Sequence, residues 1–233
     1  MSYSEEEQVE QLKRFWQDYG TPILVGISLA LAVFAGWRFW QQSQFEASAA
    51  ASGGYQAALE AAGKLATDPA DKTANADLQR QALKVIQDHP GTGYAATTAL
   101  LLAKRGMDVG DLKEAEKHLR WVLDQKKTDA GMLALTTLRL ARVLADKGDS
   151  KGALALLDQE KTPAFTPSRE ELRGDILHAS GDIAGARKAY QAAVDELVKR
   201  QEPRPLLDAK LADVGVEAPE IKRPSPVLEE KGA

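Results

Sequence analysis

The amino-acid sequence predicts an all-α protein, with a single N-terminal transmembrane helix followed by an α-solenoid of about four helix pairs. Two observations lead to this prediction. Residues 19–37 form an apolar stretch without a formal charge. Further along the chain, a Gly-Asp-x-x-x-Ala motif occurs three times between residues 110 and 186. Because the motif recurs at intervals typical of helical repeats, the chain is expected to stack similar helix pairs.

The apolar stretch is long enough to cross a bilayer as one helix. At about 1.5 Å per residue it spans roughly 28 Å, close to the thickness of the hydrocarbon core. Side chains that favour the membrane interface flank it on both sides, namely Trp16, Tyr19, Trp37, Arg38 and Trp40. We therefore predict a transmembrane helix over residues 19–40, with Pro22 in its first turn, where the missing N–H is tolerated.

An uncleaved anchor is favoured over a cleaved signal peptide. Acidic residues outnumber Lys13 and Arg14 before the span, whereas a signal peptide begins with net positive charge and has a shorter apolar run. Only Arg38 follows the span closely, so the positive-inside rule favours a cytoplasmic N-terminus and an exported C-terminal domain. The opposite orientation remains an alternative, since the difference is small.

Composition breaks divide the rest of the chain. Gly53-Gly54 is expected to mark a joint before the repeats, and prolines among charged residues indicate disorder at the C-terminus. The predicted segments are a cytoplasmic amphipathic segment (1–18), the transmembrane helix (19–40), a helical linker (41–54), the repeat domain (55–215) and a disordered Pro-rich, charged tail (216–233).

The repeated motif has a physical meaning in a helix–turn–helix. Glycine ends the first helix in a left-handed conformation, aspartate caps the second, and alanine lets the two helices approach closely. The spacings of 38 and 33 residues bracket the 34-residue period of tetratricopeptide (TPR) repeats. The signature residues are Gly110, Asp111, Ala115, Gly148, Asp149, Ala153, Gly181, Asp182 and Ala186.

Two further positions share this register. A small residue precedes each turn glycine by seven positions, at Ala103, Ala141 and Gly174. A large residue follows each turn, at Leu119, Leu157 and Tyr190. Gly106 is expected to interrupt one first helix. Residues 53–91 fit a degenerate leading pair, and a capping segment is expected around residues 206–214.

The sequence predicts no catalytic, cofactor or metal site. His89, His118 and His178 are scattered through different repeats without a ligand partner at helical spacing. Phosphate-binding loops and nucleophile elbows are also missing from the sequence. The net charge of −4 gives no electrostatic basis for binding nucleic acid. A non-enzymatic protein is therefore predicted.

A solenoid offers a concave groove, lined by the first helix of each repeat, that suits a peptide or a partner's helix. Counting from the turn glycines, the residues expected to line it are Leu100, Lys104, Leu138, Arg142, Glu171, Asp175 and His178. For any one of these residues, a solvated surface position without a ligand is an open alternative.

Several short stretches resemble one family, the ancillary SecYEG translocon subunits, also called YfgM-like proteins. The similar residues near the span are Gln8-Val9-Glu10, Leu12-Lys13-Arg14-Phe15, Gly20, Val25-Gly26 and Gly36-Trp37-Arg38. The similarity continues at residues 138–143, 172–175 and 181–182, and covers roughly residues 5–200. The last part of the chain extends past the similar region.

The resemblance implies a bacterial inner-membrane protein with one span, a cytoplasmic N-terminus and a periplasmic TPR-like domain. The implied partners are the SecYEG translocon and a membrane-anchored periplasmic chaperone of the peptidyl-prolyl isomerase type, with emerging polypeptides as further candidates. A non-enzymatic adaptor at the translocon exit follows. The alternatives are a cytoplasm-facing TPR adaptor and a homo-oligomeric scaffold that pairs through Ser28, Ala32, Ala35 and Gly36.

Overall fold

A computed structural model describes residues 3–126 and 128–219, and all regular structure within these ranges is helical. The elements are α1 (Tyr3–Thr67), α2 (Lys72–Asp88), α3 (Gly93–Asp108), α4 (Leu112–Leu123), α5 (Ala130–Asp146), α6 (Ser150–Gln159), the short 3-10 turn η1 (Pro163–Phe165), α7 (Thr166–Ala179), α8 (Ile183–Arg200) and α9 (Pro205–Asp213). The chain divides into two compact units, Met1–Ala50 and Ala51–Ala233. The predicted tail lies outside the described residues from residue 220 onward.

The first unit consists of the N-terminal part of α1. Pro22 lies in the interior of this helix and not in its first turn, because the helix begins at Tyr3. The predicted amphipathic segment and the predicted span therefore belong to one continuous helix. Within the described residues, α1 is long and apolar enough to cross a membrane, and its most apolar segment is not buried by the rest of the protein.

Helix α1 also continues into the second unit. We expected a joint at Gly53-Gly54, and this expectation is wrong: α1 passes through both glycines without a break and ends at Thr67. Gly54 serves packing instead. A Cβ atom at this position would lie 2.4 Å from Cγ2 of Val85, so only glycine lets α1 approach α2 so closely.

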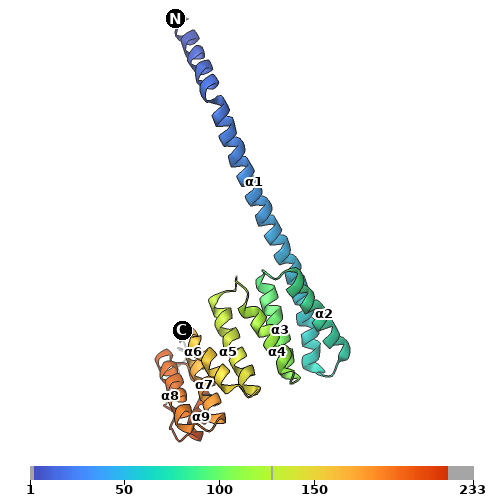
Figure 1. Ribbon diagram of the computed structural model, residues 1–233, viewed down its shortest axis with the longest axis vertical. Coiled ribbons are helices and arrows are strands. Elements are labelled where there is room, and N and C mark those ends of the chain that lie inside the picture. The colour runs from blue at the N-terminus through green and yellow to red at the C-terminus, as the bar shows by residue number, and fades with distance from the viewer. Residues whose placement is uncertain (1–2, 127, 220–233) are drawn as a thin grey trace, which may run out of the picture. The chain divides into compact units, whose positions relative to one another are not determined.

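The second unit is a series of antiparallel helix pairs, α1–α2, α3–α4, α5–α6 and α7–α8, followed by α9 (Figure 1). In α1 only the residues from Ala51 onward belong to this unit. Each pair also packs on the next, with α2 against α3, α4 against α5 and α6 against α7. The fold is thus an all-α solenoid with four helix pairs within the described residues, as the sequence predicts.

The turns inside the last three pairs share one geometry. Gly110, Gly148 and Gly181 have φ values of 76°, 87° and 85°, in the left-handed region that glycine adopts without strain. The aspartate after each glycine caps the next helix: Asp111, Asp149 and Asp182 accept hydrogen bonds from the backbone N–H groups of Glu114, Gly152 and Gly185. The alanines Ala115, Ala153 and Ala186 are fully buried.

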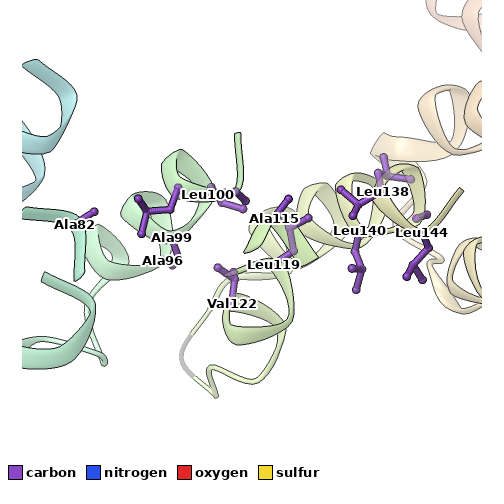
Figure 2. Packing of buried hydrophobic residues seen from close by; sticks show 14 of the residues in the cluster. Ala82, Ala96, Ala99, Leu100, Ala115, Leu119, Val122, Leu138, Leu140 and Leu144 are labelled. Carbon is purple, nitrogen blue, oxygen red and sulfur yellow. The ribbon is translucent and has the colours of Figure 1, made fainter. Parts of the chain in front are cut away.

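The core runs through the helix pairs and combines alanines with leucines (Figure 2). Close helix contacts depend on the small residues. A Cβ atom at Gly174 would lie 2.3 Å from the ring of Tyr190, so the ring of α8 packs directly on the α7 backbone. Gly106 does not interrupt α3, contrary to expectation. A Cβ atom there would lie 2.9 Å from the α4 backbone at Ala115, so this glycine also serves close packing.

Helix α9 closes the solenoid at its C-terminal end. Leu207 and Leu211 are fully buried in a cluster with Tyr190, Val194 and Leu197 of α8. The Arg187 guanidinium donates two hydrogen bonds, of 2.9 and 2.7 Å, to the carbonyl oxygen of Val214, just after α9. The capping segment expected around residues 206–214 is therefore a helix of nine residues that covers the last repeat.

Candidate protein-binding surface

The aromatic residues expected at the membrane interface lie exposed on α1. Trp16 lies just before the apolar stretch and Tyr19 at its start. Trp37 lies at its end and Trp40 just after it, and the rings of these two tryptophans are 6.1 Å apart. Arg38 is exposed between them. Exposed indole and phenol rings at both ends of an apolar helix are typical of a membrane-spanning segment, because these rings prefer the headgroup region.

Two residues expected to line the groove belong to the core. Leu100 of α3 and Leu138 of α5 are only 6% and 8% exposed and lie in one hydrophobic cluster (Figure 2). They cannot present their side chains to a bound peptide, so their assignment to the groove is wrong. The reason is helical rotation: one step along a helix turns the side chain by about 100°, so a small error in register moves a residue from surface to core.

Two further residues expected to line the groove are already bound by other side chains of the same protein. Glu171 of α7 accepts hydrogen bonds from Arg204 at 2.7 Å and from Lys210 at 2.8 Å. Asp175 lies 2.7 Å from the Lys210 ammonium and accepts a hydrogen bond of 3.0 Å from the Tyr190 hydroxyl. Helix α9 thus covers the carboxylates of α7, and these side chains hold the cap in place.

The electrostatics agree with this role. Burial by itself would raise the pKa of Glu171, but the hydrogen bonds and charges of Lys210 and Arg204 outweigh it and lower the pKa. Burial, followed by the charge of Asp175, raises the pKa of Tyr190. Glu171 therefore stays ionised and paired with Lys210 and Arg204. Because Lys210 and Tyr190 also hold Asp175, both side chains are poor candidates for contacts with a ligand.

The remaining predicted residues are accessible. The side chain of Arg142 on α5 is 54% exposed and lies 3.8 Å from Asp175, whose carboxylate is held more closely by Lys210. Lys104 on α3 is exposed and pairs with Asp108 one turn away. His178 is exposed near the end of α7. Of the seven predicted residues, the structure thus leaves these three, Lys104, Arg142 and His178, accessible to a partner.

The structure reveals an exposed face on the first helices, of which the sequence predicted only Lys104 and Arg142. Its residues lie six and two positions before the small residue of each first helix, and one position after it, a spacing that keeps them on one side of the helix. The small residue is Ala103 on α3 and Ala141 on α5, and the buried Ala61 takes this position on α1. The residues of the face are Tyr55, Leu59 and Ala62 on α1, Thr97, Leu101 and Lys104 on α3, and Leu135, Arg139 and Arg142 on α5. All are exposed or half-buried.

We call these residues, together with the exposed Tyr94 of α3, the first-helix face. The rings of Tyr55 on α1 and Tyr94 on α3 lie 5.8 Å apart. Ala62, Leu101 and Lys104 line a small cavity of about 140 Å³ that is bounded by α1, α2 and α3. Ala96 of α3 and Met132 of α5 line one pocket, together with residues of the connection between α4 and α5. On α7 the equivalent position, Asp175, is bound by Lys210 of α9, which ends the face.

Known proteins match both the anchor and the repeats. A family described as "Tetratricopeptide repeat-like domain" matches residues 13–216. A protein of Haemophilus influenzae named "Ancillary SecYEG translocon subunit" is 32% identical over 195 residues, covering 83% of this chain and 91% of that protein. This chain belongs to the ancillary SecYEG translocon subunit family.

Other members of the family show the same extent of similarity. The Escherichia coli K12 subunit of that name is 33% identical over 193 residues, covering 82% of this chain and 87% of the relative. The Neisseria gonorrhoeae subunit is 28% identical over 207 residues, covering 89% and 95%. The similarity therefore extends over most of this chain. The family that was expected from the short stretches near the span is confirmed.

Proposed function

We propose that this chain is a membrane-anchored, non-enzymatic adaptor that associates with the SecYEG translocon. Its N-terminus lies in the cytoplasm, α1 crosses the inner membrane once, and the TPR-like domain binds proteins in the periplasm. The observation that supports this proposal most directly is the match to translocon subunits over 82–83% of the chain. The match to the TPR-like family, over residues 13–216, includes both the apolar helix and the repeats.

The architecture of the repeat domain suits an adaptor. Repeat solenoids bind partners along extended surfaces, and the first-helix face offers such a surface with apolar and basic side chains. An anchor confines this surface to the membrane, so that even a weak contact with a nearby partner forms at a high effective concentration. A membrane-anchored periplasmic chaperone of the peptidyl-prolyl isomerase type and polypeptides leaving the translocon are the partners that we propose.

The orientation can be tested by thiol labelling, because the sequence contains no cysteine. A single cysteine replaces Lys151, an exposed residue in the first turn of α6. Intact spheroplasts are treated with a membrane-impermeant thiol reagent, and lysed cells serve as the accessibility control. Labelling before lysis is expected. Labelling only after lysis would place the repeats in the cytoplasm and contradict the proposed orientation.

The partners can be tested by photo-crosslinking in cells. A photoreactive amino acid replaces Arg142, on the exposed face of α5. The same substitution at Lys188, exposed on α8, provides a control on a second helix of a pair. We expect adducts with translocon subunits or with a periplasmic chaperone from the first position and weaker ones from the second. If neither position yields such adducts while the chain is intact in the membrane, the adaptor role is wrong.

A further inference from the structure

The first-helix face changes in character along the solenoid. On α1 and α3 it is apolar: Leu59 is 48% exposed and Tyr94 is 38% exposed, beside the half-buried Tyr55 and Leu101. On α5 it is basic, because Arg139 and Arg142 lie three positions apart on the exposed side of that helix. Lys104 on α3 lies one position after the small residue, as Arg142 does on α5.

The two arginines lack full charge compensation. Arg139 has no ion pair among the residues that the structure describes. Arg142 reaches only Asp175, at 3.8 Å, and that carboxylate is already held at 2.7 Å by Lys210. Lys104 differs, since Asp108 neutralises it on its own helix. An uncompensated guanidinium on an exposed face offers a fork of N–H donors that matches a carboxylate.

We infer that the first-helix face binds a polypeptide segment in which apolar side chains are followed by acidic ones. The apolar side chains contact Leu59, Tyr94 and Leu101, and the acidic ones pair with Arg139 and Arg142. The argument for this partner is charge complementarity, because a basic segment would be repelled by the arginines and a purely apolar one would leave them unpaired. The inference rests on the proposed function and adds the chemistry of the bound segment.

The contacts of α9 account for the choice of partner: acidic segments can pair with α5, whereas basic segments find no free carboxylate at Glu171 and Asp175 of α7. The carboxylates of Glu171 and Asp175 would attract a basic segment, but Arg204 and Lys210 already neutralise them. The cap therefore neutralises these two carboxylates of α7, whereas Arg139 and Arg142 of α5 keep uncompensated charge on the first-helix face. Specificity arises both from the attraction on α5 and from the blocked site on α7.

The test measures binding of fluorescent peptides to the full chain in detergent. One peptide carries leucine and phenylalanine before glutamates; in two others glutamine or lysine replaces the glutamates. The wild-type chain should bind the glutamate peptide most tightly. The double variant Arg139→Gln/Arg142→Gln should weaken this binding about tenfold, because two charge-assisted contacts are lost. Leu59→Ala should weaken all three peptides by a similar factor, roughly threefold to tenfold.

Two further variants, a matched control and a charge reversal, distinguish specific pairing from a general effect of net charge or of unfolding. The variant Lys151→Gln/Lys188→Gln removes the same charge from exposed positions on α6 and α8, and it should bind like wild type. The variant Arg139→Glu/Arg142→Glu should prefer the lysine peptide, a switch that unfolding cannot produce. Equal binding of the three peptides by wild type, or equal loss in the control variant, would overturn the inference.

The outcome can be separated from that of the proposed function. Crosslinking to translocon subunits in cells tests the adaptor role, whereas peptide titration tests the chemistry of the first-helix face. If the chain crosslinks to the translocon but binds the glutamate peptide independently of Arg139 and Arg142, the proposed function is supported and the inference about the bound segment is wrong. If the chain shows the expected peptide preference but forms no crosslinks, the inferred chemistry of the binding surface is supported and association with the translocon is contradicted.

Discussion

At the scale of single residues, glycines determine how closely neighbouring helices approach. Gly174 lies under the ring of Tyr190 and Gly54 lies against Val85, in each case with no room for a Cβ atom. Gly53, one residue before Gly54 on the same helix, has no atom within 4 Å of the Cβ that it lacks. The same residue type therefore serves packing at one position and merely weakens the helix at the next.

We predict opposite effects for alanine at these two kinds of glycine. Gly174→Ala should lower the free energy of unfolding by about 1–3 kcal/mol, because the added methyl group collides with Tyr190. Gly53→Ala should raise it by about 0.5–1 kcal/mol, because alanine favours the helix and nothing obstructs it. Chemical unfolding of the full chain in detergent measures both. A stable Gly174→Ala protein would mean that Tyr190 moves aside.

His118 provides a prediction about pH. It is 7% exposed, and its Nε2 atom lies 3.4 Å from Glu114. Burial lowers its pKa; the charge of Glu114 opposes this and that of Lys117 adds to it. Because the folded pKa is below the unfolded value of about 6.5, the unfolded chain binds more protons between the two values. The free energy of unfolding should therefore fall as the pH drops below about 6.5.

The variant His118→Gln should remove this part of the pH dependence. His178→Gln serves as the matched control, because His178 is exposed at the end of α7. Thermal unfolding of the three proteins between neutral pH and mildly acidic pH gives the slopes. If the slope is the same in wild type and in His118→Gln, the histidine is not the group that titrates on unfolding.

At the scale of elements, the cap depends on ion pairs as well as on apolar contacts. Leu207 and Leu211 anchor α9 on α8, while Arg204 and Lys210 bind Glu171 of α7. These ion pairs are partly buried, with the Glu171 side chain 14% exposed. A partly buried carboxylate that loses a partner retains the free-energy penalty of desolvation, so this network matters more than the exposed pairs along single helices.

We predict that Lys210→Met loosens α9. After the substitution, Glu171 retains only Arg204 as a partner, and Asp175 retains Tyr190 and the more distant Arg142. The free energy of unfolding should fall by about 1–2 kcal/mol. Hydrogen exchange should become faster in α9 and at the end of α8, with little change in α3 and α4. Lys188→Met, an exposed lysine on α8, should leave exchange unchanged. Uniform acceleration in all helices would show that the cap does not unfold separately.

At the scale of the whole molecule, the repeat domain begins inside the long helix. Ala51 is fully buried with Val85 and Ala95, which places the start of the second unit before the glycines where we expected a joint. The residues that carry the anchor and those that begin the solenoid core therefore belong to the same helix, α1.

A pair of shortened chains tests this boundary. A chain that starts at residue 41 keeps Ala51 and Gly54 in helical structure, whereas one that starts at residue 55 loses both contacts with α2. We predict that the second chain unfolds at a temperature lower by about 2–8 °C, which corresponds to a loss of about 1–2 kcal/mol. Circular dichroism on the two purified chains measures this difference. Equal transition temperatures would place the boundary at residue 55.

The sequence by itself determined the all-α class, the apolar helix, the three glycine turns and the family. These features depend on local chemistry: the length of an apolar run, the left-handed φ that glycine allows and the capping oxygen of aspartate. Only the tertiary structure decided which side chains are accessible. Leu100 and Leu101 are adjacent in sequence, yet the first is buried and the second half-exposed, because rotation about the helix axis and the neighbouring repeats set exposure. Likewise, Glu171 and Asp175 are neutralised by α9, which lies more than 30 positions further along the chain, and no local pattern contains such a contact.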